Sequence, residues 1–379
     1  MSAFTYELAT LHEAIKKAHP NHPEGIYAVP MYLVVGLPGS GRSTALHAMH
    51  LTWKDGDGPL RTGLPTQLCT YWLPQEGAFI EPESTVLGTS RVPEHLKQLC
   101  EELKVARPRE HLDGIILVVN IADFIDLDER ATDDYAHELR RYLVEIQQAL
   151  AADIPTYVLL TRYDTVWGFA EVFQWGPDRA KEDPWGFQMP PDLPTSEALP
   201  RFNQELEGLN ARLEAFCLAR LCSEDPPEQR IRAFQHLAEV RALMEKLRAV
   251  FKLVAMANAY ERAPWIRALA IGSALPGGGG GKLRAGVSRF FNMGLSQGPA
   301  NPVTNRPGGL PIHAYMANVI LQERDIVPLR VRWRDDKLFV VAAVIAGVLW
   351  LATVITAVVF SVQAKGHEHH AGAHTHQKK

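Results

Sequence analysis

A glycine-rich loop near the N-terminus constrains the fold of this chain more than any other feature. The apolar run at residues 31–35 (MYLVV) is followed directly by GLPGSGRST and then by ALHAMHLTW, which can continue as a helix. A strand, a glycine-rich loop and a helix in this order form the context that a P-loop requires. Such a loop aims backbone N–H groups at phosphate oxygens, so the sequence predicts a phosphate-binding loop in an α/β domain.

The candidate phosphate-binding residues all lie in this loop. The glycines permit a tight turn, and the Ser43 hydroxyl is the expected ligand of Mg²⁺. The pattern G-x-x-x-x-G-K-[ST] is met except that Arg42 stands where lysine is expected. Arginine keeps the charge but is longer and planar, so the sequence predicts a structural P-loop and leaves its occupation by nucleotide open. The candidates are Gly36, Gly39, Ser40, Gly41, Arg42, Ser43 and Thr44.

Further apolar runs predict the rest of the domain. Residues 114–120 (GIILVVN) and 156–160 (TYVLL) are continuous apolar runs, as in strands that are buried on both faces of a parallel sheet. Residues 132–151 between them have helical periodicity. Strands that alternate with helices predict a doubly wound, P-loop NTPase-like α/β fold. Helices are also expected at residues 5–18, 206–222 and 227–257.

A second candidate binding element follows the last of these strands. The residues Thr161, Arg162, Tyr163 and Asp164 come at its carboxyl end, where α/β folds bind ligands. They look like the [NT]KxD motif of GTPases, in which the aspartate accepts hydrogen bonds from guanine. Asp164 has the residue type and place for that role, and the Arg162 guanidinium can stack on a ring. A plain strand-to-loop turn with a capping aspartate is the alternative interpretation.

The element expected to sense the γ-phosphate is altered. The candidate strand at residues 77–80 is followed by Glu81, Pro82, Glu83 and Ser84. Glu81 can replace the usual aspartate as a metal-side carboxylate, but no glycine follows it, and Pro82 lacks a backbone donor. We therefore expect GTP or ATP with Mg²⁺ held by Ser43 and Glu81, a preference for guanine, and slow or absent hydrolysis. No catalytic residue is assigned, and the question of enzyme activity stays open.

An uncharged stretch at residues 338–362 predicts a membrane segment. As a helix it would be about 37 Å long, more than the roughly 30 Å of a bilayer core. More Arg and Lys precede it than follow it, which places the large N-terminal part in the cytoplasm by the positive-inside rule. A buried core helix is the alternative. Ala343 and Gly347, four residues apart, permit close helix approach and leave self-association open.

Composition limits the remaining functions. The formal net charge of −4 gives no reason to expect nucleic-acid binding. The four cysteines form no CxxC pair, which favours reduced, buried thiols over a zinc site. Five histidines after residue 365 can bind metal, but a short solvated tail is the favoured interpretation. Glycine-rich stretches at 277–281 and 296–311 predict flexible loops.

These observations divide the chain into five expected regions. An N-terminal helical segment at 1–25 precedes the P-loop NTPase-like domain at 26–200. A helical extension with glycine-rich loops follows at 201–337. A transmembrane helix at 338–362 and a His-rich tail at 363–379 complete the chain.

Several segments resemble one known family in order and spacing. They are MYLVVGLPGSGRSTAL, LCTYWLPQEGAFIE, LDGIILVVNIADFIDL, IPTYVLLTRYDTVWGFAEVF, PWIRALAIGSA and PIHAYMANVILQERDIVPLRVRWR. Together they resemble the cytoplasmic domain of the IcmF/TssM family of type VI secretion systems. The last segment is similar to the stretch that precedes a membrane span in that family.

The resemblance implies a location and partners. It implies a single-pass protein of the bacterial inner membrane, with inner-membrane and baseplate subunits of a secretion system as partners. The family usually has two membrane helices before this domain and a large periplasmic region after it, and this sequence shows neither, as in a short member. The favoured hypothesis is a partner-binding subunit with nucleotide as ligand or relic. An active membrane-anchored GTPase or ATPase switch is the alternative, and a membrane-tethered GTPase-like receptor unrelated to secretion is the third.

Overall fold

The computed structural model consists of two compact units, Met1–Pro328 and Leu329–Lys379. The structure describes residues 2–23, 25–53, 59–60, 67–87, 94–174, 185–222, 226–257, 261–273, 310, 312–324, 326–327, 345–346 and 349–357.

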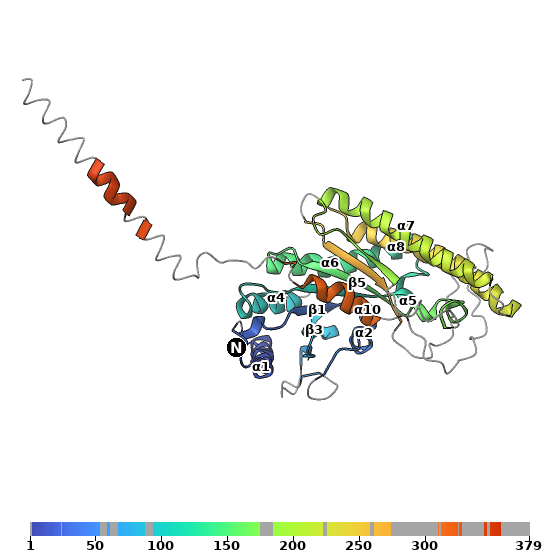
Figure 1. Cartoon of the computed structure of the whole chain (residues 1–379), viewed down its shortest axis with the longest axis horizontal. Coiled ribbons are helices and arrows are strands. Elements are labelled where there is room, and N and C mark those ends of the chain that lie inside the picture. Colours follow the sequence, from blue (N-terminus) through green and yellow to red (C-terminus); the bar gives the residue numbers. More distant parts are fainter. Residues whose placement is uncertain are drawn as a thin grey trace, which may run out of the picture. The chain divides into compact units, whose positions relative to one another are not determined.

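A seven-stranded sheet in the order β2-β3-β1-β4-β5-β7-β6 forms the centre of the first unit (Figure 1). The five inner strands β3, β1, β4, β5 and β7 run parallel, and β2 and β6 pair antiparallel at the two edges. The strands are β1 (Met31–Val35), β2 (Cys69–Trp72), β3 (Ala78–Pro82), β4 (Gly114–Asn120), β5 (Pro155–Thr161), β6 (Trp185–Gln188) and β7 (Trp265–Ile271).

The two faces of the sheet bury alternate residues of each strand. On β1, Met31, Leu33 and Val35 join a large cluster with the main helices, whereas Tyr32 and Val34 join a second cluster on the other face. Both faces are covered, which is why the central strands are apolar at nearly every position. The helices of the large cluster are α1 (Ala3–Ala18), α3 (Ser84–Leu87), α4 (Glu94–Ala106), α5 (Ile121–Phe124), α6 (Glu129–Leu150), α7 (Thr195–Leu221) and α8 (Pro227–Val254).

The second face carries fewer elements. The helix α2 (Arg42–Ala48) and a C-terminal segment contribute its buried residues. This segment contains α10 (Ile312–Tyr315), the π-helix η5 (Met316–Ile320) and the 3-10 helix η6 (Leu321–Glu323). The short helical turns η1 (Gly25–Tyr27), η2 (Tyr163–Thr165) and η3 (Ala170–Gln174) connect other elements.

The predicted strands agree closely with the structure, whereas the helix expected at 206–222 begins eleven residues earlier, at Thr195. The strands expected at 31–35 and 114–120 are confirmed with those bounds, and the strand expected at 156–160 is β5, one residue longer at each end. The helix expected at 132–151 begins three residues earlier, because the Asp128 side chain accepts a hydrogen bond from Ala131 N and caps it. The mixed α/β class is therefore confirmed.

Three strands were not predicted: β2, β6 and β7. Among them β7 matters most, because it lies in the region 201–337 that we expected to be a helical extension. It pairs in parallel with β5 and antiparallel with β6. The region therefore contributes an inner strand to the main sheet, and residues 1–328 form one compact unit.

The predicted membrane segment is described only in part. Residues 345–346 and 349–357 are helical, and the rest of 338–362 lies outside the described residues. Within the part of the chain that the structure describes, no helix has the length and apolar character needed to cross a membrane. The His-rich tail, the glycine run at 277–281 and nearly all of 296–311 also lie outside the described residues.

Candidate functional site

The loop between β1 and α2 has the backbone conformation that its glycines allow. Gly39 and Gly41 have φ angles of +83° and +86°, which side chains of other residues rarely tolerate. Gly36 approaches the neighbouring strand so closely that a Cβ atom would lie 2.3 Å from the Val118 carbonyl oxygen. Strand, tight loop and helix follow one another as predicted, at the carboxyl end of β1, which lies between β3 and β4 in the sheet.

The Arg42 side chain folds back into this loop instead of extending into solvent. Its Nη1 donates a hydrogen bond to the Gly36 carbonyl oxygen at 3.0 Å. Its Nε lies 3.5 Å from Glu81 Oε1, and both side chains are more than nine-tenths buried. The positive charge at the altered P-loop position is therefore already compensated by a carboxylate.

Glu81 connects the loop to β3 and β2. Ser43 Oγ donates to Glu81 Oε1 at 2.7 Å, and Trp72 Nε1 donates to Glu81 Oε2 at 3.1 Å. Ser43 and Glu81, the two expected metal-side residues, are thus in direct contact. Trp72 was not predicted as part of the site, because the strand that carries it was not predicted.

The motif at residues 161–164, which we call the base-side motif, lies against the same loop. Thr161 Oγ1 donates to the Ser40 carbonyl oxygen at 2.8 Å and joins the end of β5 to the P-loop. Asp164 is buried, and its Oδ1 accepts a hydrogen bond from Ser273 Oγ at 2.7 Å. Arg162 is exposed in a left-handed conformation with φ of +61°, and Thr44 is exposed on the first turn of α2. The structure therefore brings both candidate motifs to one edge of the sheet.

Sequence reasoning missed three polar residues near the motif at 161–164. Ser273 follows β7, so it could have been found only by predicting that strand. Asn120 ends β4, and its Nδ2 donates to Asp123 Oδ1 at 2.7 Å. Burial raises the pKa of Asp123, while the Arg162 charge lowers it. The signal available in the sequence was the polar Asn120 at the end of a buried strand.

Two features of the loop fit a phosphate group. Ser40 is almost fully buried, and among the described residues its hydroxyl has no hydrogen-bond partner. The side of the loop where Gly39 would carry a Cβ is open, with no atom within 4 Å. The Glu81 carboxylate beside Arg42 repels a second anion. The loop would therefore attract a phosphate less strongly than a loop whose cation has no carboxylate beside it.

The motif at 161–164 is also joined to α8. Tyr163 OH lies 2.9 Å from His236 Nε2, and His236 Nδ1 lies 2.6 Å from the Trp167 carbonyl oxygen. Because a carbonyl only accepts, Nδ1 carries the proton and Nε2 accepts from the tyrosine. Burial lowers the pKa of His236 to about 4, so the ring is neutral near pH 7.

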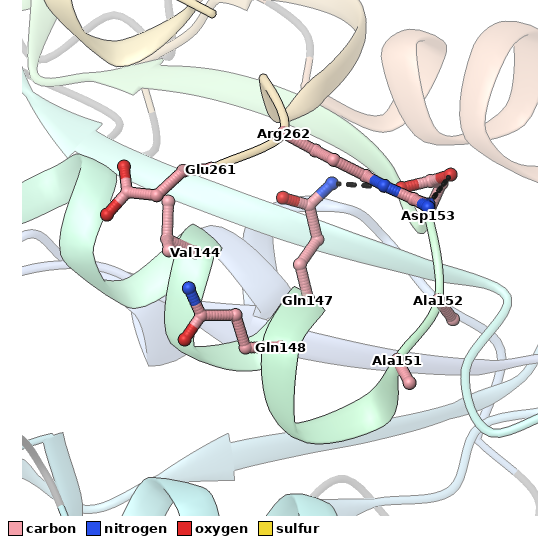
Figure 2. A pocket seen from close by; sticks show the side chains of 8 residues that line it. All are labelled: Val144, Gln147, Gln148, Ala151, Ala152, Asp153, Glu261 and Arg262. Carbon is pink, nitrogen blue, oxygen red and sulfur yellow. Dashed lines mark hydrogen bonds and ion pairs between the residues drawn. The ribbon is translucent and has the colours of Figure 1, made fainter. Parts of the chain in front are cut away.

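A separate pocket of about 290 Å³ lies at the C-terminal end of α6 (Figure 2). Its charged side chains are already paired: Arg262 Nη1 lies 3.0 Å from Asp153 Oδ2, and Arg140 Nη2 lies 3.0 Å from Glu261 Oε2. Gln147 reaches toward Asp153 across the same pocket in Figure 2. The pocket holds none of the P-loop or base-side candidates.

Fold and loop define an α/β protein with a P-loop-like turn at the carboxyl edge of its sheet. The family model of the IcmF-related N-terminal domain matches residues 90–348. The chain therefore belongs to the IcmF-related family, which confirms the resemblance found in the sequence.

One characterised relative is similar over most of this chain. The type VI secretion system component TssM1 of Pseudomonas aeruginosa is 27% identical over 282 residues, which cover 69% of this chain and 26% of TssM1. The chain thus spans about a quarter of the length of that relative.

Solved structures show a fainter likeness. The G domain of the FeoB iron transporter of T. maritima is 16% identical, with a TM-score of 0.23, 36% of this chain covered and 74% of the other. The cytosolic domain of the same transporter in a GDP form is 13% identical, with a TM-score of 0.23 and coverages of 59% and 97%. At these TM-scores the likeness carries no argument about function.

Proposed function

We propose that this chain is an inner-membrane component of a type VI secretion apparatus, with a cytoplasmic domain that binds partner subunits and takes nucleotide as a weak ligand. The observation that supports it is the family match over residues 90–348, together with the similarity to TssM1. The chain corresponds to about a quarter of TssM1, so the partners of the whole relative are proposed here and not transferred.

The proposed nucleotide site consists of the loop and the base-side motif. Gly39, Gly41 and Ser40 provide backbone N–H groups and a hydroxyl for phosphate oxygens. Ser43 and Glu81 would hold Mg²⁺, which would neutralise the phosphates and the nearby carboxylate together. Binding is expected to be weak, because Arg42 is held by Glu81 and by the Gly36 carbonyl.

The proposed base preference rests on Asp164. Its carboxylate accepts hydrogen bonds, and guanine presents two N–H donors on one edge that match the two oxygens of a carboxylate. The Ser273 hydroxyl fixes the orientation of Asp164, so the carboxylate is held in place before a ligand arrives. The ligand proposed is therefore GTP with Mg²⁺, with ATP as the weaker alternative.

Hydrolysis is proposed to be slow or absent. Glu81 is followed by Pro82, which lies in β3 opposite Cys69 and has no N–H to donate to a γ-phosphate. Both Glu81 oxygens already accept hydrogen bonds, from Ser43 and Trp72, which weakens the carboxylate as a base for an attacking water. These contacts favour a binding domain over an enzyme.

The second candidate function is an active membrane-anchored GTPase or ATPase switch. The observation that favours it is the buried Asp164–Ser273 hydrogen bond, which holds the base-side carboxylate in one orientation. Turnover at roughly 1 per second or faster, in the ordinary range for enzymes, would support this second candidate over the first.

The partner-binding proposal is tested by co-purification from membranes. Two variants are compared with the whole chain: one has residues 338–362 replaced by an unrelated span, and the other lacks residues 1–320. We expect the swapped-span protein to retain the inner-membrane and baseplate subunits of the secretion system, and the bare anchor to lose them. If the bare anchor keeps the partner subunits and the swapped-span protein loses them, the span determines partner binding, and the proposal is contradicted.

A further inference from the structure

One segment of the first unit begins at Leu310, which is buried in the large cluster, and continues over the second face of the sheet; we call it the strap. It comprises residue 310 and residues 312–324, and includes α10, η5 and η6. Buried side chains of residues 312–324 share a cluster with those of α2 and of the strands on the second face. These side chains are Ile312, Tyr315, Met316 and Ile320.

The first part of the strap touches the proposed nucleotide site beside Asp164. Ser273, which holds Asp164, donates its N–H to the Leu310 carbonyl oxygen at 3.5 Å. At the preceding Gly272, a Cβ atom would lie 2.5 Å from Ile312 Cγ1. The backbone that positions Asp164 and the first residues of the strap are therefore in tight contact.

A second contact joins the strap to the P-loop helix. The His313 ring stacks on the His50 ring, with centroids 5.2 Å apart and planes at 17°. His50 comes two residues after α2 ends, and α2 carries Arg42 and Ser43. A movement of the loop and α2 on phosphate binding would therefore reach the strap directly.

The far end of the strap is fixed to the sheet. Glu323 is buried, and Arg267 binds it with two groups: Nε donates to Oε2 at 3.1 Å, and Nη2 donates to Oε1. Tyr157 OH and Gln188 Nε2 donate to the same carboxylate at 3.0 and 2.6 Å. Four hydrogen bonds from three strands hold one side chain, so this end cannot slide without leaving a buried charge uncompensated.

A π-helix separates the two ends. The five residues of η5 follow a wider turn than an α-helix, a geometry that occurs in short pieces and is frequent at functional sites. We propose that the strap is a nucleotide-responsive element: phosphate and base contacts shift its first part, and η5 takes up this shift because Glu323 fixes the far end to the sheet. This inference rests on the proposed nucleotide binding.

The test measures backbone amide hydrogen exchange of the full-length chain in membranes, with and without GTP and Mg²⁺. Nucleotide binding is measured in the same sample with a fluorescent GTP analogue. We expect exchange in peptides from 312–324 to slow at least threefold on binding, while peptides from 134–146 of α6 stay unchanged. Binding without any change in the strap would overturn this inference alone. Absence of binding would overturn the proposed nucleotide site and the strap inference with it.

Two variants separate coupling from general destabilisation. His313→Ala removes an exposed ring contact, and we expect it to keep the unfolding temperature while at least halving the nucleotide-induced protection of the strap. Glu323→Gln weakens the far anchor, and because coupling is reciprocal we expect at least threefold weaker GTP affinity. The matched control Glu261→Gln breaks the Arg140–Glu261 pair, away from the strap, and should leave that affinity unchanged. Wild-type protection in His313→Ala would overturn the inference even if Glu323→Gln fails to fold.

Discussion

Arg42 and Glu81 form an ion pair inside the glycine-rich loop, with Nε and Oε1 3.5 Å apart and both side chains buried. The pair places a negative charge where a phosphate would need a positive field. It also brings Ser43 into hydrogen-bond contact with the same carboxylate. Arg42 therefore offers a phosphate a positive charge that a carboxylate already compensates.

The first prediction concerns this carboxylate. Glu81→Gln should strengthen GTP binding in the absence of Mg²⁺ by about five- to tenfold, because it removes a like charge next to the phosphates, worth about 1 kcal/mol or more in a partly buried site. The same change should reduce the stimulation of binding by Mg²⁺. Titration with a fluorescent GTP analogue, with EDTA or with Mg²⁺, measures both effects.

A neighbouring residue provides the control for this change. Glu83 lies two residues after Glu81 in the chain and is exposed. Its carboxylate accepts a hydrogen bond from the Thr70 hydroxyl. Glu83→Gln should leave both affinities within about twofold of the wild type, since its charge is screened by solvent. Equal effects of the two variants would show that general surface charge, and not the loop interior, sets the affinity.

The second prediction concerns base preference. Asp164→Asn should remove most of the preference for guanine over adenine, because an amide presents a donor where guanine needs an acceptor. Ser273→Ala should weaken GTP binding about three- to tenfold by releasing the Asp164 orientation, the usual net scale of one ordinary hydrogen bond. Competition between GTP and ATP measures the preference. Asp134→Asn, an exposed change on α6, should leave it unaltered.

The third prediction concerns pH. His236 has a folded-state pKa lowered to about 4 by burial, below its ordinary value of 6.5. The neutral ring is therefore favoured in the fold, and its stabilisation is complete above pH 6.5 and is lost as the pH falls toward 4. The full effect is roughly 3 kcal/mol.

Urea unfolding at several pH values between about 7 and 4 measures this loss. His236→Gln should be less stable at neutral pH, since it loses the contact with Tyr163, but its stability should fall less steeply with acid. The exposed His137→Gln serves as the control and should keep the wild-type slope. A His236→Gln slope identical to the wild type would contradict the assignment.

The fourth prediction compares two glycines. Gly168 has φ of +79°, and a Cβ atom there would lie 2.5 Å from the Arg232 carbonyl oxygen, so Gly168→Ala should destabilise the fold by about 2–3 kcal/mol or more. Gly208 lies within α7, where an added Cβ atom would have no neighbour within 4 Å, so Gly208→Ala should stabilise by about 0.5–1 kcal/mol. Chemical unfolding measures both, and effects of the same sign would contradict the packing described for Gly168.

The fifth prediction concerns topology. If residues 338–362 span the membrane with the first unit in the cytoplasm, a cysteine placed at Ala373 should react with a membrane-impermeant thiol reagent added outside intact spheroplasts. Cys222 is exposed and should be changed to serine to remove background labelling, while the other three cysteines are buried. Labelling that requires cell lysis would place the tail in the cytoplasm.

Much of the candidate site followed from local pattern. The apolar run at 31–35 and the glycines after it specify β1 and the tight loop, because few other backbones satisfy those residues. The motif at 161–164 could be placed at the carboxyl end of a strand for the same reason. Ser273 and Trp72 could not be assigned, because their roles depend on strands that are short or that join the sheet from far away in sequence.

The sequence by itself determined the α/β class and the P-loop-like turn, since hydrophobic periodicity and glycine placement act locally, and its segments resembled the family that the comparisons confirm. Only the tertiary structure decided that β7 enters the sheet between β5 and β6 and delivers Ser273 to Asp164. It also decided that Arg42 turns inward to Glu81. Strand order and buried charge pairing depend on contacts between distant segments, where the free energy of desolvation and packing outweighs any local preference.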